Sequence, residues 1–184
     1  DGVEVSGRNA RPGDAVLVSG AVGDHGLAIM TRREGLEFES PLQSDCAPLN
    51  GLVAALLDAC PVHTLRDPTR GGVAATLNEY AASSKVGIRV VERSIPIQPA
   101  VSGACGLLGF DPLLVANEGK LIAAVAPSAA DRILAAMRKH PHGVNASIIG
   151  TVTAENPGQV QLQTILGSWR LLDMPVGEQL PRIC

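Results

Sequence analysis

The chain has few aromatic residues, no net positive charge and no long apolar run. Only 2% of its 184 residues are aromatic, and its net charge is −3. Nucleic-acid-binding domains typically carry a basic surface, and single strands stack on aromatic side chains, so we expect no nucleic-acid partner. No apolar segment is long enough to cross a bilayer, and no signal-peptide pattern opens the chain. We therefore expect no membrane partner.

Cysteine is also scarce, and the four thiols lie far apart at positions 46, 60, 105 and 184. No CxxC pair occurs, so we predict no zinc site and no other metal ligands. With 46% apolar residues the chain can build a core without disulfides, which favours reduced thiols and a cytoplasmic protein. Cys60 falls on an apolar helical face and is expected in the core. The sequence assigns no role to Cys46 or Cys105.

Short apolar runs and helical periodicities mix along the chain, which predicts an α+β domain with a mixed β-sheet and packed helices. We expect this domain at 1–172 and an extended, flexible tail at 173–184. Because the chain starts at Asp1 without methionine, we expect it to be either a piece of a longer protein or a processed one. The expected strands are 15–19, 62–66, 87–92, 113–116, 121–126, 146–152, 159–164 and 169–172. The expected helices are one of about ten residues ending near Gly35, then 49–60, 73–84, 100–108 and 128–140, the last with a Ser128–Asp131 capping box.

Two glycine-rich segments follow predicted strands and open predicted helices. The first is Gly20–Gly26, with Asp24 as expected N-cap and His25 beside it. The second is Asp67-Pro68-Thr69-Arg70-Gly71-Gly72. Free N–H groups at a helix N-terminus, together with the Thr69 and Arg70 donors, suit a phosphate or carboxylate. The alternatives are that glycines merely permit the turns, that Asp24, Asp67 and Thr69 only cap helices, and that Arg70 faces solvent.

Glu118 and Cys184 are the candidate reactive groups. Glu118 lies in Asn117-Glu118-Gly119-Lys120, which we expect to join two apolar strands; a carboxylate partly withdrawn from water has a raised pKa and can act as a base. The alternative is a solvated turn glutamate. Cys184 is the last residue, an ordinary thiol on a segment that can reach about 33 Å when extended from residue 175. It is either a mobile carrier or part of a tail without function.

The motifs GDAVLVSGAVGDHGLAIM at 13–30, RDPTRGGVAATLNEYA at 66–81, LLVANEGKL at 113–121 and the final PRIC closely resemble the HypE family of hydrogenase maturation proteins. The resemblance covers essentially the whole chain. It corresponds to the C-terminal part of that family, within the PurM-like superfamily that includes aminoimidazole ribonucleotide (AIR) synthetase and selenophosphate synthetase. It implies the fold of the second domain of that superfamily. It also implies that the N-terminal domain, which in this superfamily supplies most of the nucleotide site and the dimer contact, lies outside this sequence.

The resemblance implies an ATP-dependent carbamoyl dehydratase, a lyase of hydrogenase maturation. A HypF-type carbamoyltransferase would carbamoylate Cys184, and the protein would dehydrate this thiocarboxamide to a thiocyanate. Its cyano group would pass to iron held by HypC–HypD for the [NiFe]-hydrogenase centre. Glu118 would be the base or an orienting group. Phosphate or the docked tail would be held by Asp67, Thr69, Arg70, Gly71 and Gly72, with Asp24 and His25 nearby.

The resemblance further implies ATP with Mg²⁺, bound mostly by the absent domain, and a homodimer of the full-length protein. The present chain alone is therefore expected to be inactive. Two alternatives remain. One is the C-terminal domain of another ATP-dependent enzyme of the superfamily, for which Cys184 would be dispensable. The other is a non-catalytic docking module for maturation partners, in which Cys184 would stay unmodified.

Overall fold

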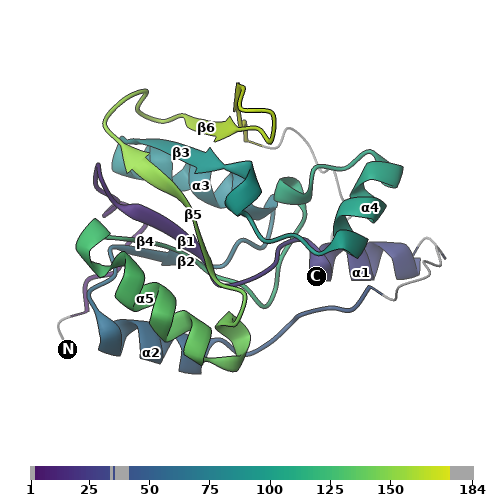
Figure 1. Ribbon diagram of the computed structural model, residues 1–184, viewed down its shortest axis with the longest axis horizontal. Helices are drawn as coiled ribbons and strands as arrows, with labels where there is room; N and C mark the ends of the chain where they lie inside the picture. The colour runs from purple at the N-terminus through teal and green to yellow at the C-terminus, as the bar shows by residue number, and fades with distance from the viewer. Residues whose placement is uncertain (1–2, 34, 36–41, 175–184) are drawn as a thin grey trace.

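The computed structural model describes residues 3–33, 35 and 42–174, which fold around one seven-stranded sheet (Figure 1). The strand order is β2-β4-β1-β5-β3-β6-β7. β3 and β6 pair in parallel, and the other neighbouring strands are antiparallel. This mixed sheet confirms the predicted α+β class. The strands are β1 (Ala15–Val18), β2 (Thr64–Arg66), β3 (Gly87–Val91), β4 (Ile122–Val125), β5 (Ser147–Thr153), β6 (Val160–Gln163) and β7 (Trp169–Leu171).

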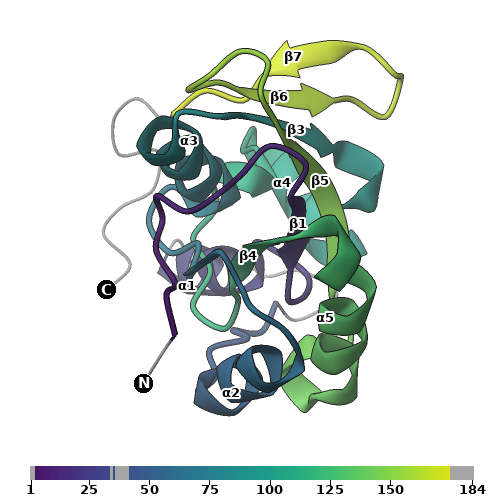
Figure 2. The ribbon, with the colours of Figure 1, turned by 90° about the vertical axis from the view of Figure 1, so that its left-hand side faces the viewer.

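Helices cover both faces of the sheet. α3 lies on one face, α2 and α5 pack on the other, and α1 and α4 lie together beyond one end of the central strands (Figures 1 and 2). No helix in the described part of the chain is long and apolar enough to span a bilayer. The helices are α1 (Asp24–Arg33), α2 (Asn50–Ala59), α3 (Gly72–Ser84), α4 (Pro99–Leu108) and α5 (Pro127–Lys139), with 3₁₀ turns η1 (Glu92–Ser94), η2 (Pro112–Leu114) and η3 (Pro141–Gly143).

The central strand β1 is buried on both faces, and its side chains alternate between two clusters. Val16 and Val18 pack in the cluster that contains α3, whereas Leu17 packs against α2 and α5. Each such side chain stabilises the fold by about 1.5–3 kcal/mol. Aliphatic residues make up most of both layers, as the low aromatic content requires, and Tyr80 is buried in the first. Cys60 is buried in the second cluster, which confirms its predicted place in the core.

The predicted strand at 113–116 is wrong. Pro112–Leu114 is the 3₁₀ turn η2, and Asp111 accepts a 3.0 Å hydrogen bond from the Leu113 N–H. This run is apolar because η2 packs against α3 and α4, and Pro112 and the Asp111 cap favour a tight turn over a strand. β4 pairs instead with β1 and β2. Glu118 therefore lies in an irregular loop and not in a hairpin.

The starts of two helices also differ from the sequence prediction. α5 begins at Pro127, and its N-cap is Ala126, which makes no side-chain capping bond. The Ser128–Asp131 capping box is not formed, because proline is already set for the first helical position and starts the helix before Ser128 could cap it. Asp24 is the first residue of α1 and not the residue before it.

Candidate functional site

The loop at 115–119 lies between the two glycine-rich segments and is bonded to both. The Asn117 side chain is fully buried; its Oδ1 accepts from the Gly23 N–H at 2.8 Å. Its Nδ2 donates to the Pro68 carbonyl at 3.2 Å and to the Val115 carbonyl at 2.9 Å. The Asn117 N–H donates to the same Pro68 carbonyl at 3.1 Å. The two segments are therefore brought together through Asn117.

Two glycines allow this close approach. A Cβ on Gly26 would lie 2.5 Å from Val115 Cγ1, and the Gly26 N–H donates to the Ala116 carbonyl at 3.1 Å. Gly72 has φ +61°, and a Cβ there would lie 2.5 Å from the Val115 carbonyl oxygen. Neither position has room for a side chain. The glycines of both segments thus let α1 and α3 begin against the loop at 115–119.

The Asp67–Gly72 segment presents exposed polar groups at the start of α3. Thr69 Oγ1 donates to Asp67 Oδ2 at 2.5 Å. Arg70 is exposed and makes no ion pair within the described residues. Gly71 is the N-cap of α3, with φ +70°. In the described chain no acceptor takes the N–H of Arg70 or Gly71, so both donors remain available at the start of α3.

The Gly20–Gly26 segment is less open to an anion than its sequence indicates. The N–H groups of Gly23 and Gly26 are already used by Asn117 and Ala116. His25 is buried, with its Nδ1 2.8 Å from Ser44 Oγ. Asp24 is half-buried, and burial raises the pKa of its carboxyl group; nearby Asp45 raises it further and Lys120 opposes the shift. A second carboxylate so close makes this end of the site unsuited to an anion.

Asp24 lines a cavity of about 470 Å³ beside this turn. Lys120 forms an ion pair with Asp45 in its wall, and the two side chains are only 11% and 18% exposed. Asp45 Oδ1 is buried and has no hydrogen-bond partner among the residues that the structure describes. A Cβ on Gly119 would lie 1.8 Å from the Asp45 carbonyl oxygen. The segment around Asp45 therefore lies directly against the loop that carries Glu118.

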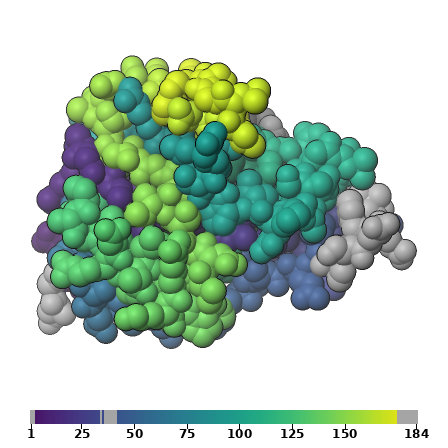
Figure 3. Space-filling model, in the orientation of Figure 1, coloured from purple at the N-terminus to yellow at the C-terminus, as the bar shows by residue number. Residues whose placement is uncertain are grey.

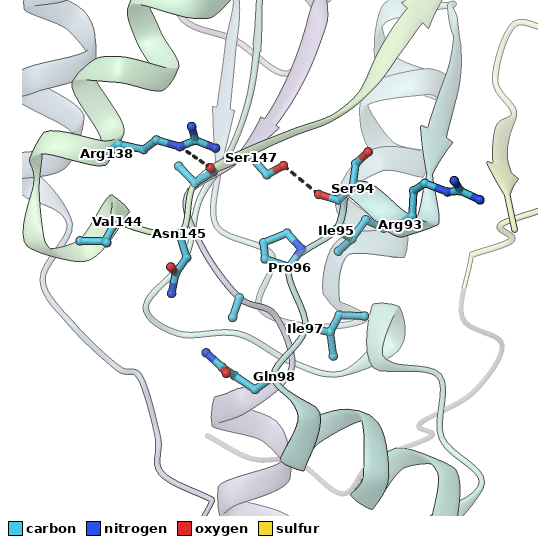
Figure 4. A pocket seen from close by; sticks show the side chains of 12 residues that line it. Arg93, Ser94, Ile95, Pro96, Ile97, Gln98, Arg138, Val144, Asn145 and Ser147 are labelled. Carbon is cyan, nitrogen blue, oxygen red and sulfur yellow. Dashed lines mark hydrogen bonds between the residues drawn. The ribbon is translucent and has the colours of Figure 1, made fainter. Parts of the chain in front are cut away.

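A wider groove of about 610 Å³ adjoins this cavity and shares part of its lining. It lies where the teal segment after β3 meets the green segment after α5 on the face seen in Figure 3. Figure 4 shows the amide groups of Gln98 and Asn145 near one another at one end of it. Ser147 Oγ donates to the Ser94 carbonyl at 2.8 Å in its wall. Its lining combines polar side chains such as Arg93, Gln98 and Asn145 with apolar ones such as Ile95 and Val144.

The structure brings some of the predicted site residues together and leaves others apart. Glu118 is half-buried between Asn117 and Gly119, both of which are fixed by the contacts above. The Asp67–Gly72 segment is bonded to this loop through the Pro68 carbonyl. Asp24 follows Gly23, whose N–H donates to Asn117. Glu118 lines neither of the two cavities described here. Cys184 and the predicted tail from 175 onward lie outside the described residues.

Sequence reasoning missed three residues whose contacts hold the candidate site together. Asn117 and Lys120 lie in the same segment as Glu118, which was interpreted only as a turn, and Asp45 lies in a stretch interpreted as irregular. For Asn117, the sequence offered one signal, which is an asparagine directly after an apolar run. Nothing in the sequence pairs Asp45 with Lys120, because 75 residues separate them.

The fold and this arrangement of loops define a class of protein. Residues 11–163 match the family of the AIR synthase related protein, C-terminal domain, and the chain belongs to that family. The mixed sheet and the placement of its helices agree with this family and with the solved structures described next.

Within this class, the chain is similar to carbamoyl dehydratase HypE. It is 54% identical over 186 residues to HypE of Rhizobium leguminosarum bv. viciae, covering 100% of this chain and 53% of that protein. It is 55% identical over 184 residues to HypE of Azotobacter vinelandii, covering 100% of this chain and 54% of that protein. The chain thus spans about half the length of the curated relatives it matches.

Crystal structures of HypE share its fold closely. Hydrogenase maturation protein HypE matches with a TM-score of 0.94 at 49% identity, over 98% of this chain and 58% of that one. HypE in complex with ATP matches with a TM-score of 0.93 at 48% identity, over 98% and 55%. A HypE–HypF complex matches with a TM-score of 0.90 at 45% identity, over 95% and 57%.

Proposed function

We propose that this chain is the C-terminal half of an ATP-dependent carbamoyl dehydratase that converts a carbamoylated Cys184 to a thiocyanate. The observation that carries the proposal is the bonding of three motif segments through Asn117, which joins the Asp67–Gly72 segment to the loop that contains Glu118. Relatives 54% and 55% identical are named carbamoyl dehydratase HypE. The sequence also supplies, at position 184, the cysteine thiol that the proposed reaction would use.

The chemistry has two steps. In the first, the oxygen of the S-bound carbamoyl group attacks the γ-phosphorus of ATP; ADP leaves, and the nitrogen gives up one proton. In the second, the nitrogen gives up its remaining proton, the carbon–oxygen bond breaks, and inorganic phosphate leaves a thiocyanate. Phosphorylation is needed because an unactivated amide oxygen is a poor leaving group. The carbon and sulfur keep their bond throughout, and one oxygen passes to phosphate.

The described residues can carry defined parts of this scheme. The unpaired N–H groups of Arg70 and Gly71 and the Arg70 guanidinium would neutralise a phosphate or orient the docked tail. Glu118 would accept a nitrogen proton in either step. The residues on both sides of it are held in place, so the backbone from which the Glu118 side chain extends has a defined position.

ATP is proposed as the co-substrate, and a HypE structure with ATP supports this. The donors of the Asp67–Gly72 segment fit a phosphate group but not a whole nucleotide. For Mg²⁺ the fit is poor, since no group of three or more His, Cys, Asp or Glu suited to a metal ion occurs in residues 3–33, 35 and 42–174. The ligands for Mg²⁺ would come from the part of the HypE relatives that this chain does not cover. No step described above depends on the metal.

The partners are also part of the proposal. A structure of HypE with HypF supports a HypF-type carbamoyltransferase as the source of the carbamoyl group. Delivery of cyanide to iron on HypC–HypD, a homodimer of the complete protein and a cytoplasmic location rest on the family resemblance.

The proposal is tested by mass spectrometry of the C-terminal peptide. This chain, joined to the half that the HypE relatives carry in addition, is incubated with carbamoyl phosphate, ATP and the partner carbamoyltransferase. We expect a carbamoyl adduct on Cys184 that then loses the mass of one water. A Cys184→Ala variant is the control and should remain unchanged. A peptide that is never modified would favour a docking module. Full ATP-dependent turnover of a free substrate by Cys184→Ala would favour another enzyme of the superfamily.

A further inference from the structure

Asn117 uses its side-chain amide completely, and it does so inside the protein. Both Nδ2 hydrogens have acceptors, the carbonyls of Pro68 and Val115, and Oδ1 accepts from the Gly23 N–H. The side chain is 0% exposed. It therefore cannot touch a substrate in the solvent-facing site, and any effect on the reaction must pass through its neighbours.

The three bonds join segments that are remote in the sequence. Gly23 lies 94 residues from Asn117 and directly precedes α1; Pro68 lies 49 residues away and opens the Asp67–Gly72 segment. Only a side chain with both donors and an acceptor, at this length, satisfies all three backbone groups. An ionised aspartate would face two carbonyl oxygens with no hydrogen to offer, and leucine would leave a buried N–H without an acceptor.

Glu118 directly follows Asn117 in the chain. On its other side, Gly119 lies so close to the Asp45 carbonyl that a Cβ would come within 1.8 Å of it, and Lys120 forms an ion pair with the Asp45 carboxylate. The Glu118 backbone is thus held between two fixed neighbours. The Pro68 carbonyl, which receives two bonds from Asn117, sits at the start of the donors around Arg70 and Gly71.

We infer that Asn117 is a positioning residue, which sets the place of the Glu118 carboxylate relative to the phosphate-binding donors of the Asp67–Gly72 segment. This inference rests on the proposed function. A shift of about 1 Å between reacting groups can lower a rate on the order of 100-fold. We therefore expect the loss to appear in the rate of dehydration, with little change in the KM for ATP.

The test measures water loss from carbamoylated Cys184 by the complete enzyme, with this chain joined to the half that its HypE relatives add. Asn117→Ala removes all three bonds. Asn117→Asp keeps the size and the acceptor but loses both donors. Asn117→Ser is smaller and keeps one polar group, and it carries the test if the alanine variant does not fold. The control is Ile133→Ala, a fully buried residue of α5 on the opposite face of the sheet. It lowers stability without touching the loop at 115–119.

The expected result is that kcat for water loss falls on the order of 100-fold in the Asn117 variants while the KM for ATP stays near its wild-type value. Ile133→Ala should keep kcat close to wild type at a temperature where it is folded. If the Asn117 variants keep wild-type kcat, or if Ile133→Ala loses as much as they do, the positioning role is wrong and the proposed function stands. If the wild-type enzyme forms no thiocyanate, the proposed function fails and the inference falls with it.

Discussion

Replacing Gly72 by alanine tests whether α3 really begins against the loop at 115–119. Gly72 has φ +61°, and its added Cβ would lie 2.5 Å from the Val115 carbonyl oxygen and 2.6 Å from that of Leu113. The left-handed conformation costs a non-glycine residue about 1–2 kcal/mol. Relieving an overlap with two backbone oxygens adds about 1–3 kcal/mol, because backbone cannot turn away as a flexible side chain can.

A second glycine separates these two costs. Gly109, the C-cap of α4, has φ +74°, and a Cβ there would meet nothing within 4 Å. Gly109→Ala therefore carries the conformational cost alone, about 1–2 kcal/mol. We expect Gly72→Ala to lower the free energy of unfolding by about 1–3 kcal/mol more than Gly109→Ala does.

The assay is urea unfolding of the two variants and the wild type, followed by circular dichroism, with the thermal midpoint as a second measurement. For a domain of this size each 1 kcal/mol corresponds to about 2–4 °C, so a total loss of about 3 kcal/mol lowers Tm by about 6–12 °C. Equal losses in the two variants would mean that the Val115 carbonyl can move away at no cost. The close packing on which the site rests would then be refuted.

Two further predictions concern single ionisable groups. Burial, with the Asp45 charge second, raises the pKa of Asp24 above 3.8, so the folded protein binds this proton more tightly than the unfolded chain. The resulting destabilisation is complete above the folded-state pKa and disappears as pH falls to 3.8. Asp24→Asn should therefore raise the free energy of unfolding at pH 7. In urea-unfolding titrations this gain should shrink as the pH is lowered. A gain that is independent of pH would contradict the assigned cause. Burial also raises the pKa of the Cys105 thiol to about 11, whereas Cys46 is exposed. Iodoacetamide at pH 8, with peptide mass spectrometry, should alkylate Cys46 well before Cys105 or the buried Cys60, and rapid labelling of Cys105 in native protein would show that its surroundings open.

The sequence alone determined the class of the fold and the identity of most motif residues. Apolar runs and helical periodicity depend on neighbours within about a dozen positions, so the stripe of α2 and the strand β1 could be predicted from local pattern. The glycines at 23, 71 and 72 have positive φ angles, which is also a local backbone need. The error at 113–116 has the same origin, because a buried apolar run looks alike in a strand and in a turn packed against helices.

Only the tertiary structure decided how the candidate site is assembled. The bonds from Asn117 to Gly23 and Pro68, and the ion pair of Lys120 with Asp45, join residues 49 to 94 positions apart. No local pattern encodes such partners, because in the unfolded chain water can satisfy each polar group. Folding then removes this water. Once the Asn117 side chain is buried, its amide must find partners within the protein, and that requirement joins the loop at 115–119 to Gly23 and Pro68.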